Sequence, residues 1–137
     1  MPKSPWTRTD TGVGWALGLV FVAAGILKVA DPLAFALSLA RLVPPGAVGP
    51  LAIVLPWIEI AAGAALLALP SYRGAALAIL ITLLVTFTVA LAVGSGPCGC
   101  FGTVGLLARR DVGLGRNVLL LAAAAWLTYR SRPASPA

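Results

Sequence analysis

The 137-residue sequence contains no histidine, one methionine and only four acidic side chains, against ten lysines and arginines. Charged residues make up 10% of the chain, whereas soluble domains carry about 25%. With two cysteines and no histidine, the chain cannot complete a four-ligand zinc site by itself. The basic residues form no run and are not interleaved with aromatic residues, which argues against nucleic-acid binding. The scarcity of charge excludes a soluble globular domain.

Apolar residues account for 60% of the sequence, and the mean hydropathy is +0.99. A bilayer core about 30 Å thick requires roughly 20 apolar residues per crossing helix. Segments of this kind lie near residues 12–30, 50–69, 74–93 and 112–129. We therefore predict an all-α integral membrane protein, a four-helix bundle in a lipid bilayer, with residues 1–137 forming a single transmembrane domain.

The stretch between the first two predicted helices, near residues 32–42, is too short to cross a bilayer. Asp31 is a natural N-cap, Pro32 is a natural first helical residue, and Pro44 with Pro45 ends the stretch. These signals predict a short helix that lies at the membrane interface or against the bundle.

The first predicted helix has an alternative interpretation as a cleaved signal peptide. A basic N-terminus precedes it, and Val22 to Ala24 resemble a cleavage site. Its apolar run is longer than a usual signal core, which favours a retained helix. Gly14 and Gly18 also suit close helix packing in lipid, where small residues let helix backbones approach.

Four crossings place both termini on one side of the membrane. The segments after the first and third helices then lie together on the other side. Lysines and arginines are slightly more numerous on the side of the termini, and the positive-inside rule places that side in the cytoplasm. We expect the segment after the third helix to face an oxidising compartment.

That segment carries both cysteines in the sequence GPCGCFG, with only Gly99 between Cys98 and Cys100. A disulfide across so small a ring is strained, and strain makes the bond more easily reduced. Closing so short a loop removes little entropy from the unfolded chain, so the bond would be a weak structural staple. The spacing therefore favours a reversible redox pair. Two inert thiols, a cuprous copper site on two thiolates and lipidation of one cysteine remain open as alternatives.

Ionisable residues inside membrane segments are costly and are functional candidates by default. Glu59 lies near the centre of the second predicted helix, and we expect its carboxyl group to face the bundle interior. There it could relay a proton or hydrogen-bond a quinone. The structural alternative is a bond to Lys28, Arg116 or a threonine of the third helix.

Three further residues are supporting candidates. Lys28 could extend to the interface and pair with Asp31 one turn away, or Lys28 or Arg116 could lie near the thiols and favour a thiolate. Asn117, at the start of the fourth helix, could cap a backbone group or bind a ligand.

Four motifs in order, AAGILKVADPLAF, LPWIEIAAGAALL, GPCGCFG and GRN, resemble the MauE branch of the MauE/DoxX family of redox-associated membrane proteins. The resemblance covers about Gly12 to Tyr129. It implies a four-helix protein of the bacterial inner membrane that acts beside a thioredoxin-like partner. MauE itself is associated with maturation of methylamine dehydrogenase, but nothing in this sequence identifies that enzyme as the client.

Together these features predict a membrane thiol-disulfide oxidoreductase or electron relay. Cys98 and Cys100 would exchange electrons with an extracytoplasmic thioredoxin-like protein or disulfide-containing client and pass them to a quinone, with Glu59 as a third catalytic residue. Two other classes stay open. One is a non-catalytic membrane anchor for a redox partner, and the other is a carrier that binds a metal or small solute through its thiols.

Overall fold

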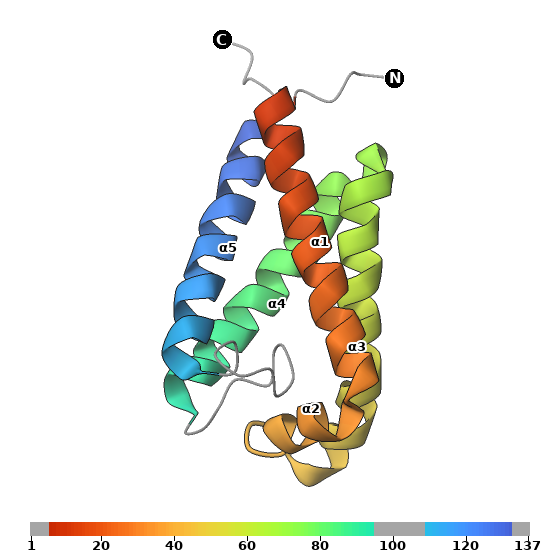
Figure 1. The fold of residues 1–137 in the computed structure, drawn as a ribbon, viewed down its shortest axis with the longest axis vertical. Helices are drawn as coiled ribbons and strands as arrows, with labels where there is room; N and C mark the ends of the chain where they lie inside the picture. Colours follow the sequence, from red (N-terminus) through yellow and green to blue (C-terminus); the bar gives the residue numbers. More distant parts are fainter. Residues whose placement is uncertain (1–5, 95–108, 133–137) are drawn as a thin grey trace.

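The computed structural model describes residues 6–94 and 109–132. Within these residues the chain forms α1 (Arg8–Ala30), α2 (Pro32–Leu39), α3 (Pro45–Ala68), the short 3-10 helix η1 (Pro70–Tyr72), α4 (Arg73–Val93) and α5 (Arg110–Arg130). Figure 1 shows the four long helices as a bundle, with α2 at the end opposite the chain termini. The described part is predominantly helical and contains no strand, which confirms the predicted fold class.

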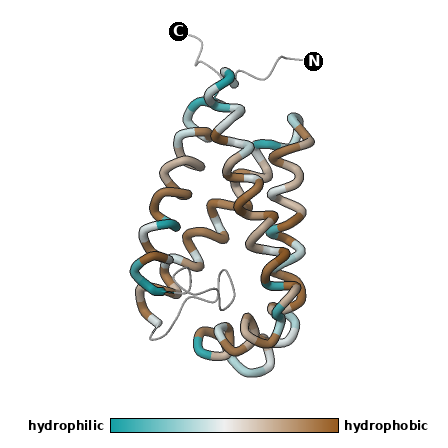
Figure 2. The backbone as a smooth tube through the Cα atoms, in the orientation of Figure 1, coloured by the Kyte–Doolittle hydropathy of each residue, from teal (hydrophilic) through white to brown (hydrophobic). Residues whose placement is uncertain are grey.

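Four helical segments are long and apolar enough to cross a membrane, namely Arg8–Ala30, Pro45–Ala68, Pro70–Val93 and Arg110–Arg130. Hydrophobic residues run along the long helices in Figure 2, and hydrophilic residues gather mainly near the helix ends. Outward-facing apolar side chains, such as Leu119 at 72% exposure and Ile53 at 67%, suit contact with lipid tails. The protein is therefore a multi-pass membrane protein.

α1 and α3 start four and five residues earlier than the hydropathy pattern predicted. α1 begins at Arg8 because Thr7 and Asp10 form a capping box, in which each side chain accepts a hydrogen bond from the other residue's backbone N–H. α3 begins at Pro45, five residues before the predicted start, and Pro45 occupies the first turn, where its missing N–H costs nothing. Pro44 and Pro45 therefore start α3 in addition to ending the preceding segment.

The main core lies between α1, α3, α4 and α5. Its buried residues are Leu17, Phe21, Ala62, Leu66, Ala76, Leu77, Leu80, Leu84, Ala124 and Leu127. A smaller cluster, formed by Phe35, Leu39 and Ala52, holds α2 against α3. α2 is thus packed against the bundle through one face, while Leu33 and Leu37 on its other face are exposed.

Glycines bring α1 and α3 into close contact. A Cβ atom added to Gly18 would lie 2.9 Å from the carbonyl oxygen of Gly63, and one added to Gly63 would lie 2.7 Å from the carbonyl oxygen of Gly18. Only residues without side chains allow two helix backbones to approach this closely in lipid. Of the two glycines singled out in the sequence, Gly18 lies in this contact, whereas Gly14 packs under the ring of Trp6.

Candidate functional site

Lys28 and Glu59 form an ion pair inside the bundle. Lys28 is in the last turn of α1, and Glu59 lies within α3. The ammonium nitrogen Nζ is 2.5 Å from Oε1 and 2.6 Å from Oε2 of Glu59, so it donates to both carboxylate oxygens. Each side chain is only 1% exposed. Both charged groups are thus buried inside the protein, and each neutralises the charge of the other.

Two aromatic rings also face the Lys28 ammonium group. Nζ lies 4.8 Å from the ring centre of Phe87 on α4 and 5.2 Å from that of Phe35 on α2. Ring faces carry negative electrostatic potential and attract a cation at these distances, more strongly when water is absent. Elements α1, α2, α3 and α4 therefore converge on one ammonium group.

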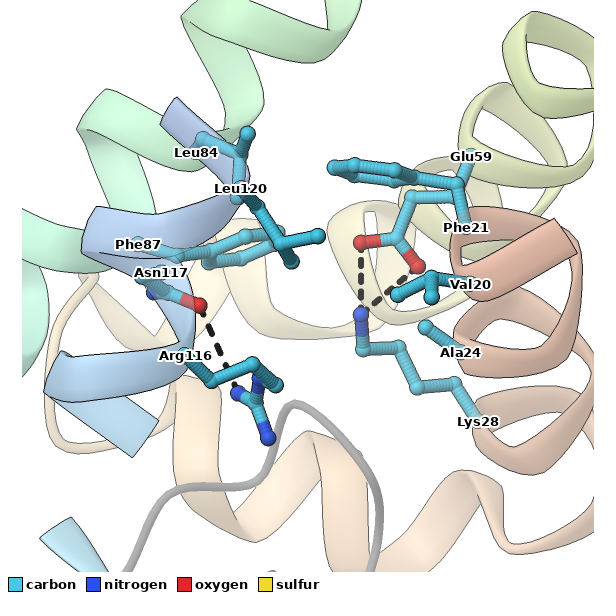
Figure 3. Close-up of a pocket in the computed structure, with 10 residues that line it drawn as sticks. All are labelled: Val20, Phe21, Ala24, Lys28, Glu59, Leu84, Phe87, Arg116, Asn117 and Leu120. Atoms are coloured by element: carbon cyan, nitrogen blue, oxygen red, sulfur yellow. Dashed lines mark hydrogen bonds and ion pairs between the residues drawn. The ribbon is translucent and has the colours of Figure 1, made fainter. Parts of the chain in front are cut away.

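A small cavity separates the ion pair from α5, as Figure 3 shows. Its volume is about 20 Å³, enough for about one water molecule. Across the cavity from Lys28 and Glu59 lie Arg116 and Asn117 of α5. The apolar part of the lining consists of Val20, Phe21, Ala24, Leu84, Phe87 and Leu120.

The α5 side of the cavity is also polar. Arg116 Nη2 donates to Oδ1 of Asn117 over 3.4 Å, and Asn117 is 3% exposed. The amide nitrogen Nδ2 of Asn117 is buried and has no hydrogen-bond partner among the described residues. Buried amides are normally satisfied, so this N–H donor is available to a further acceptor.

Four of the residues selected from sequence therefore line one cavity: Lys28, Glu59, Arg116 and Asn117. The inward orientation expected for Glu59 is confirmed by its burial. The interface-exposed position considered for Lys28 is wrong, because its ammonium group turns into the bundle and pairs with Glu59 across 31 residues of sequence. Of the structural alternatives considered for Glu59, Lys28 is the observed partner.

Asp31 is not part of the cavity and does not pair with Lys28. Its Oδ1 accepts a hydrogen bond of 3.1 Å from the backbone N–H of Ala34, so Asp31 caps the N-terminus of α2 as its sequence position indicated. The capping role expected for Asp31 is therefore confirmed, and a supporting role at the site stays a prediction.

Cys98 and Cys100 lie outside the described residues. The residues that border their segment are held at the α2 end of the bundle. Arg110 Nε donates to the carbonyl oxygen of Leu91 over 2.8 Å, and its Nη2 donates to that of Ala92 over 2.6 Å. A Cβ atom on Gly94 would lie 3.2 Å from Leu42, in the connection between α2 and α3. The segments after α1 and after α4 thus begin on the same side, as predicted from four crossings.

A second polar cluster joins α1 and α5 at the opposite end. Asp10 is 1% exposed, and its Oδ1 accepts a hydrogen bond of 3.2 Å from the indole nitrogen of Trp126, while Oδ2 lies 3.5 Å from Nε of Arg130. Trp6 donates to Oγ of Ser131 over 2.6 Å. This cluster was not predicted from the sequence, because an acidic residue three positions after Thr7 indicates only a helix start.

In residues 6–94 and 109–132, no three side chains of the metal-binding types histidine, cysteine, aspartate and glutamate lie together. The polar groups at the cavity comprise one carboxylate, two cations and one amide. This set can hold or transfer a proton and can orient hydrogen-bond acceptors. The fold and the cavity define a small multi-pass membrane protein with a buried ion pair beside a water-sized void.

The family model described as methylamine utilisation protein MauE matches residues 6–130. The chain therefore belongs to the MauE family, as its motifs indicated. No curated protein matches the chain, and no solved structure matches it.

Proposed function

We propose that this MauE-family protein is a membrane thiol-disulfide oxidoreductase or electron relay in which Cys98 and Cys100 are the redox pair. The observation that supports the proposal most is the Lys28–Glu59 pair, both partners 1% exposed within a membrane bundle. Ionisable groups at such positions are costly to bury and mark ion or proton pathways. A simple anchor has no need of them.

The reaction starts with the Cys98–Cys100 disulfide and a dithiol of a thioredoxin-like protein. One partner thiolate attacks a sulfur of the disulfide and forms a mixed disulfide, and the second partner thiolate then resolves it. The partner ends as a disulfide, and Cys98 and Cys100 end as two thiols that have gained two electrons and two protons. Reoxidation transfers these two electrons and two protons to a quinone, which becomes a quinol.

Glu59 and Lys28 suit the proton part of this cycle. A proton that moves from the ammonium group to the carboxylate converts two charges into two neutral groups, and the pair has zero net charge in both states. The pair can therefore pass a proton between its two partners with no change in net charge, and it can relay protons when one proton leaves the pair as another enters. The cavity beside it, at about 20 Å³, suits a water molecule that would pass the proton, so we assign Glu59 a proton role.

The proposed location is the bacterial inner membrane, with the termini in the cytoplasm and the cysteines outside. The slight excess of lysine and arginine on the side of the termini supports this orientation. An extracytoplasmic thioredoxin-like protein would then approach from the α2 end, where the borders of the cysteine segment lie.

Covalent capture of the partner tests the proposal. In Cys98→Ser and Cys100→Ser variants, the remaining thiolate should attack the disulfide of an oxidised thioredoxin-like protein and accumulate as a mixed disulfide, because this chain's second thiol, which would release the partner in the reverse exchange, is missing. The double serine variant is the matched control and should capture nothing. Absence of any captured protein from both single variants, in membranes where the partner is present, would refute the proposal. A double serine variant that still supports the partner's activity would identify an anchor instead.

A further inference from the structure

Gly25 of α1 and Pro56 of α3 meet at the level of the buried ion pair. The two helices run antiparallel, as Figure 1 shows. Gly18 lies against Gly63, and about two turns further along α1 Gly25 lies against Pro56, about two turns back along α3. These two contacts define one continuous seam between the helices.

The charged side chains reach each other across this seam. Lys28 follows Gly25 by three residues, and Glu59 follows Pro56 by three residues, so each starts roughly 4.5 Å beyond the contact along its own helix. Helical side chains lean toward the N-terminus of their helix. Because the helices are antiparallel, Lys28 and Glu59 lean toward each other, and they meet at the level where Gly25 touches Pro56.

The approach at Gly25 leaves no room for a side chain. A Cβ atom there would lie 2.7 Å from the carbonyl oxygen of Pro56 and 2.5 Å from Cγ1 of Ile60. Atoms do not pack at these separations, and the Pro56 oxygen belongs to the backbone. Any larger residue at position 25 must therefore move α1 relative to α3 at the ion pair.

We propose that Gly25 is a positioning residue for the ion pair. By lacking a side chain, it sets the separation of α1 and α3 at which the Lys28 ammonium group reaches both oxygens of Glu59. The effect of Gly25 on the redox cycling of Cys98 and Cys100 rests on the proposed function. Its effect on the geometry of the ion pair does not.

A double-mutant cycle on stability tests the positioning role directly. Gly25→Ala is introduced into the wild-type chain and into a Lys28→Met/Glu59→Leu background, and unfolding is followed in detergent. We expect a clearly smaller loss of stability in the background without the pair, because there is no pair to disturb.

Gly18→Ala is the matched control. Its Cβ atom would lie 2.8 Å from Leu67 and 2.9 Å from the Gly63 oxygen, a similar clash on the same seam but two turns from the pair. The loss of stability caused by Gly18→Ala should be equal in both backgrounds. A Cβ atom on Gly12 would meet no described atom within 4 Å beyond the neighbouring backbone of α1. Gly12→Ala should therefore cause no loss of stability in either background. Equal losses for Gly25→Ala in the two backgrounds would overturn the proposal.

Redox turnover provides the second readout. After a pulse of dithiothreitol, reoxidation of Cys98 and Cys100 in native membranes should be about tenfold slower in Gly25→Ala, and within about twofold of wild type in Gly18→Ala. Equal slowing by both variants would overturn the positioning role in turnover. If the wild-type cysteines do not cycle at all, the proposed function fails, while the stability cycle still decides the role of Gly25.

If the Gly25→Ala protein does not accumulate, the double variant Gly25→Ala/Ile60→Ala replaces it in the stability measurements. It removes the side-chain part of the clash and retains the contact with the Pro56 oxygen, so the same pair of backgrounds applies. The loss should again be smaller without the ion pair, and equal losses would again contradict the proposal.

Discussion

Lys28 and Glu59 are 31 residues apart in sequence, yet Nζ of the lysine contacts both carboxylate oxygens of the glutamate at 2.5 and 2.6 Å. Both side chains are almost completely buried. Removing two charges from water costs several kcal/mol per ion, and mutual attraction offsets this cost only when the geometry is good. Bidentate contact and two aromatic ring faces supply that geometry. The pair is thus well satisfied, but it is not an efficient source of stability, which favours a functional reason for its presence.

Removing one partner of the pair should harm the protein more than removing both. Lys28→Met leaves a buried carboxylate without its cation and should cost about 3–5 kcal/mol of unfolding free energy. Lys28→Met/Glu59→Leu leaves no buried charge and should cost far less. Reversible unfolding in mixed detergent micelles measures both. The exposed Arg109–Asp111 pair gives the control, because Asp111→Asn should leave the transition unchanged. A double variant as unstable as Lys28→Met would contradict the account.

Glu59→Gln should block the proton step, in addition to the loss of stability expected when one partner of the pair is removed. Glutamine has the same shape but cannot accept a proton, and general acid–base groups typically contribute about 10²–10⁴-fold to rate. We expect at least 100-fold slower reoxidation of the reduced cysteines in membranes, measured per folded molecule so that any lower accumulation of the variant does not affect the comparison. Asp31→Asn is the control, since asparagine caps a helix as well as aspartate and Asp31 lies outside the cavity. Unchanged turnover in Glu59→Gln would show that the carboxyl group carries no proton.

Arg110 should control the order of the last turn of α4. Its guanidinium group donates hydrogen bonds to the carbonyl oxygens of Leu91 and Ala92. Carbonyl oxygens in the last turn of a helix have no donor within the helix. Arg110→Ala should raise amide hydrogen exchange in residues 90–94, read by mass spectrometry. Arg109→Ala removes an arginine whose described contact is the exposed pair with Asp111, and it should leave this exchange unchanged. Equal exchange in both variants would mean that Arg110 does not hold the end of α4.

Trp126 should stabilise the packing of α1 against α5. Trp126→Phe removes the hydrogen bond to the buried Asp10 carboxylate but keeps the aromatic ring, so the thermal midpoint in detergent should fall. Trp15→Phe is the control, because Trp15 is 51% exposed on the outer surface and no described side-chain bond involves it. If both variants melt at the wild-type temperature, the indole bond makes no net contribution.

The sequence was sufficient to predict the four long helices, the short helix after Pro32 and the inward orientation of Glu59, because each rests on local hydropathy or capping. It offered Lys28, Arg116 and a threonine of the third helix as partners for Glu59 but could not choose among them. Lys28 lies near a helix end, where lysine commonly extends to the interface, and only the antiparallel packing of α1 on α3 turns it inward. Phe35 and Phe87 were missed for the same reason, since apolar residues in an apolar chain give no signal of their own. Likewise, the start of α3 at Pro45 depends on a proline that equally well reads as a stop.

The account depends most on Cys98 and Cys100 alternating between a disulfide and two thiols in the membrane. Alkylation with a maleimide of added mass, before and after a dithiothreitol pulse in native membranes, measures both states on a gel. We expect an unlabelled oxidised form at rest, a doubly labelled form after the pulse, and return to the oxidised form once the reductant is removed. Cysteines that remain doubly labelled throughout, or that label only after denaturation and reduction at every time point, would contradict the account.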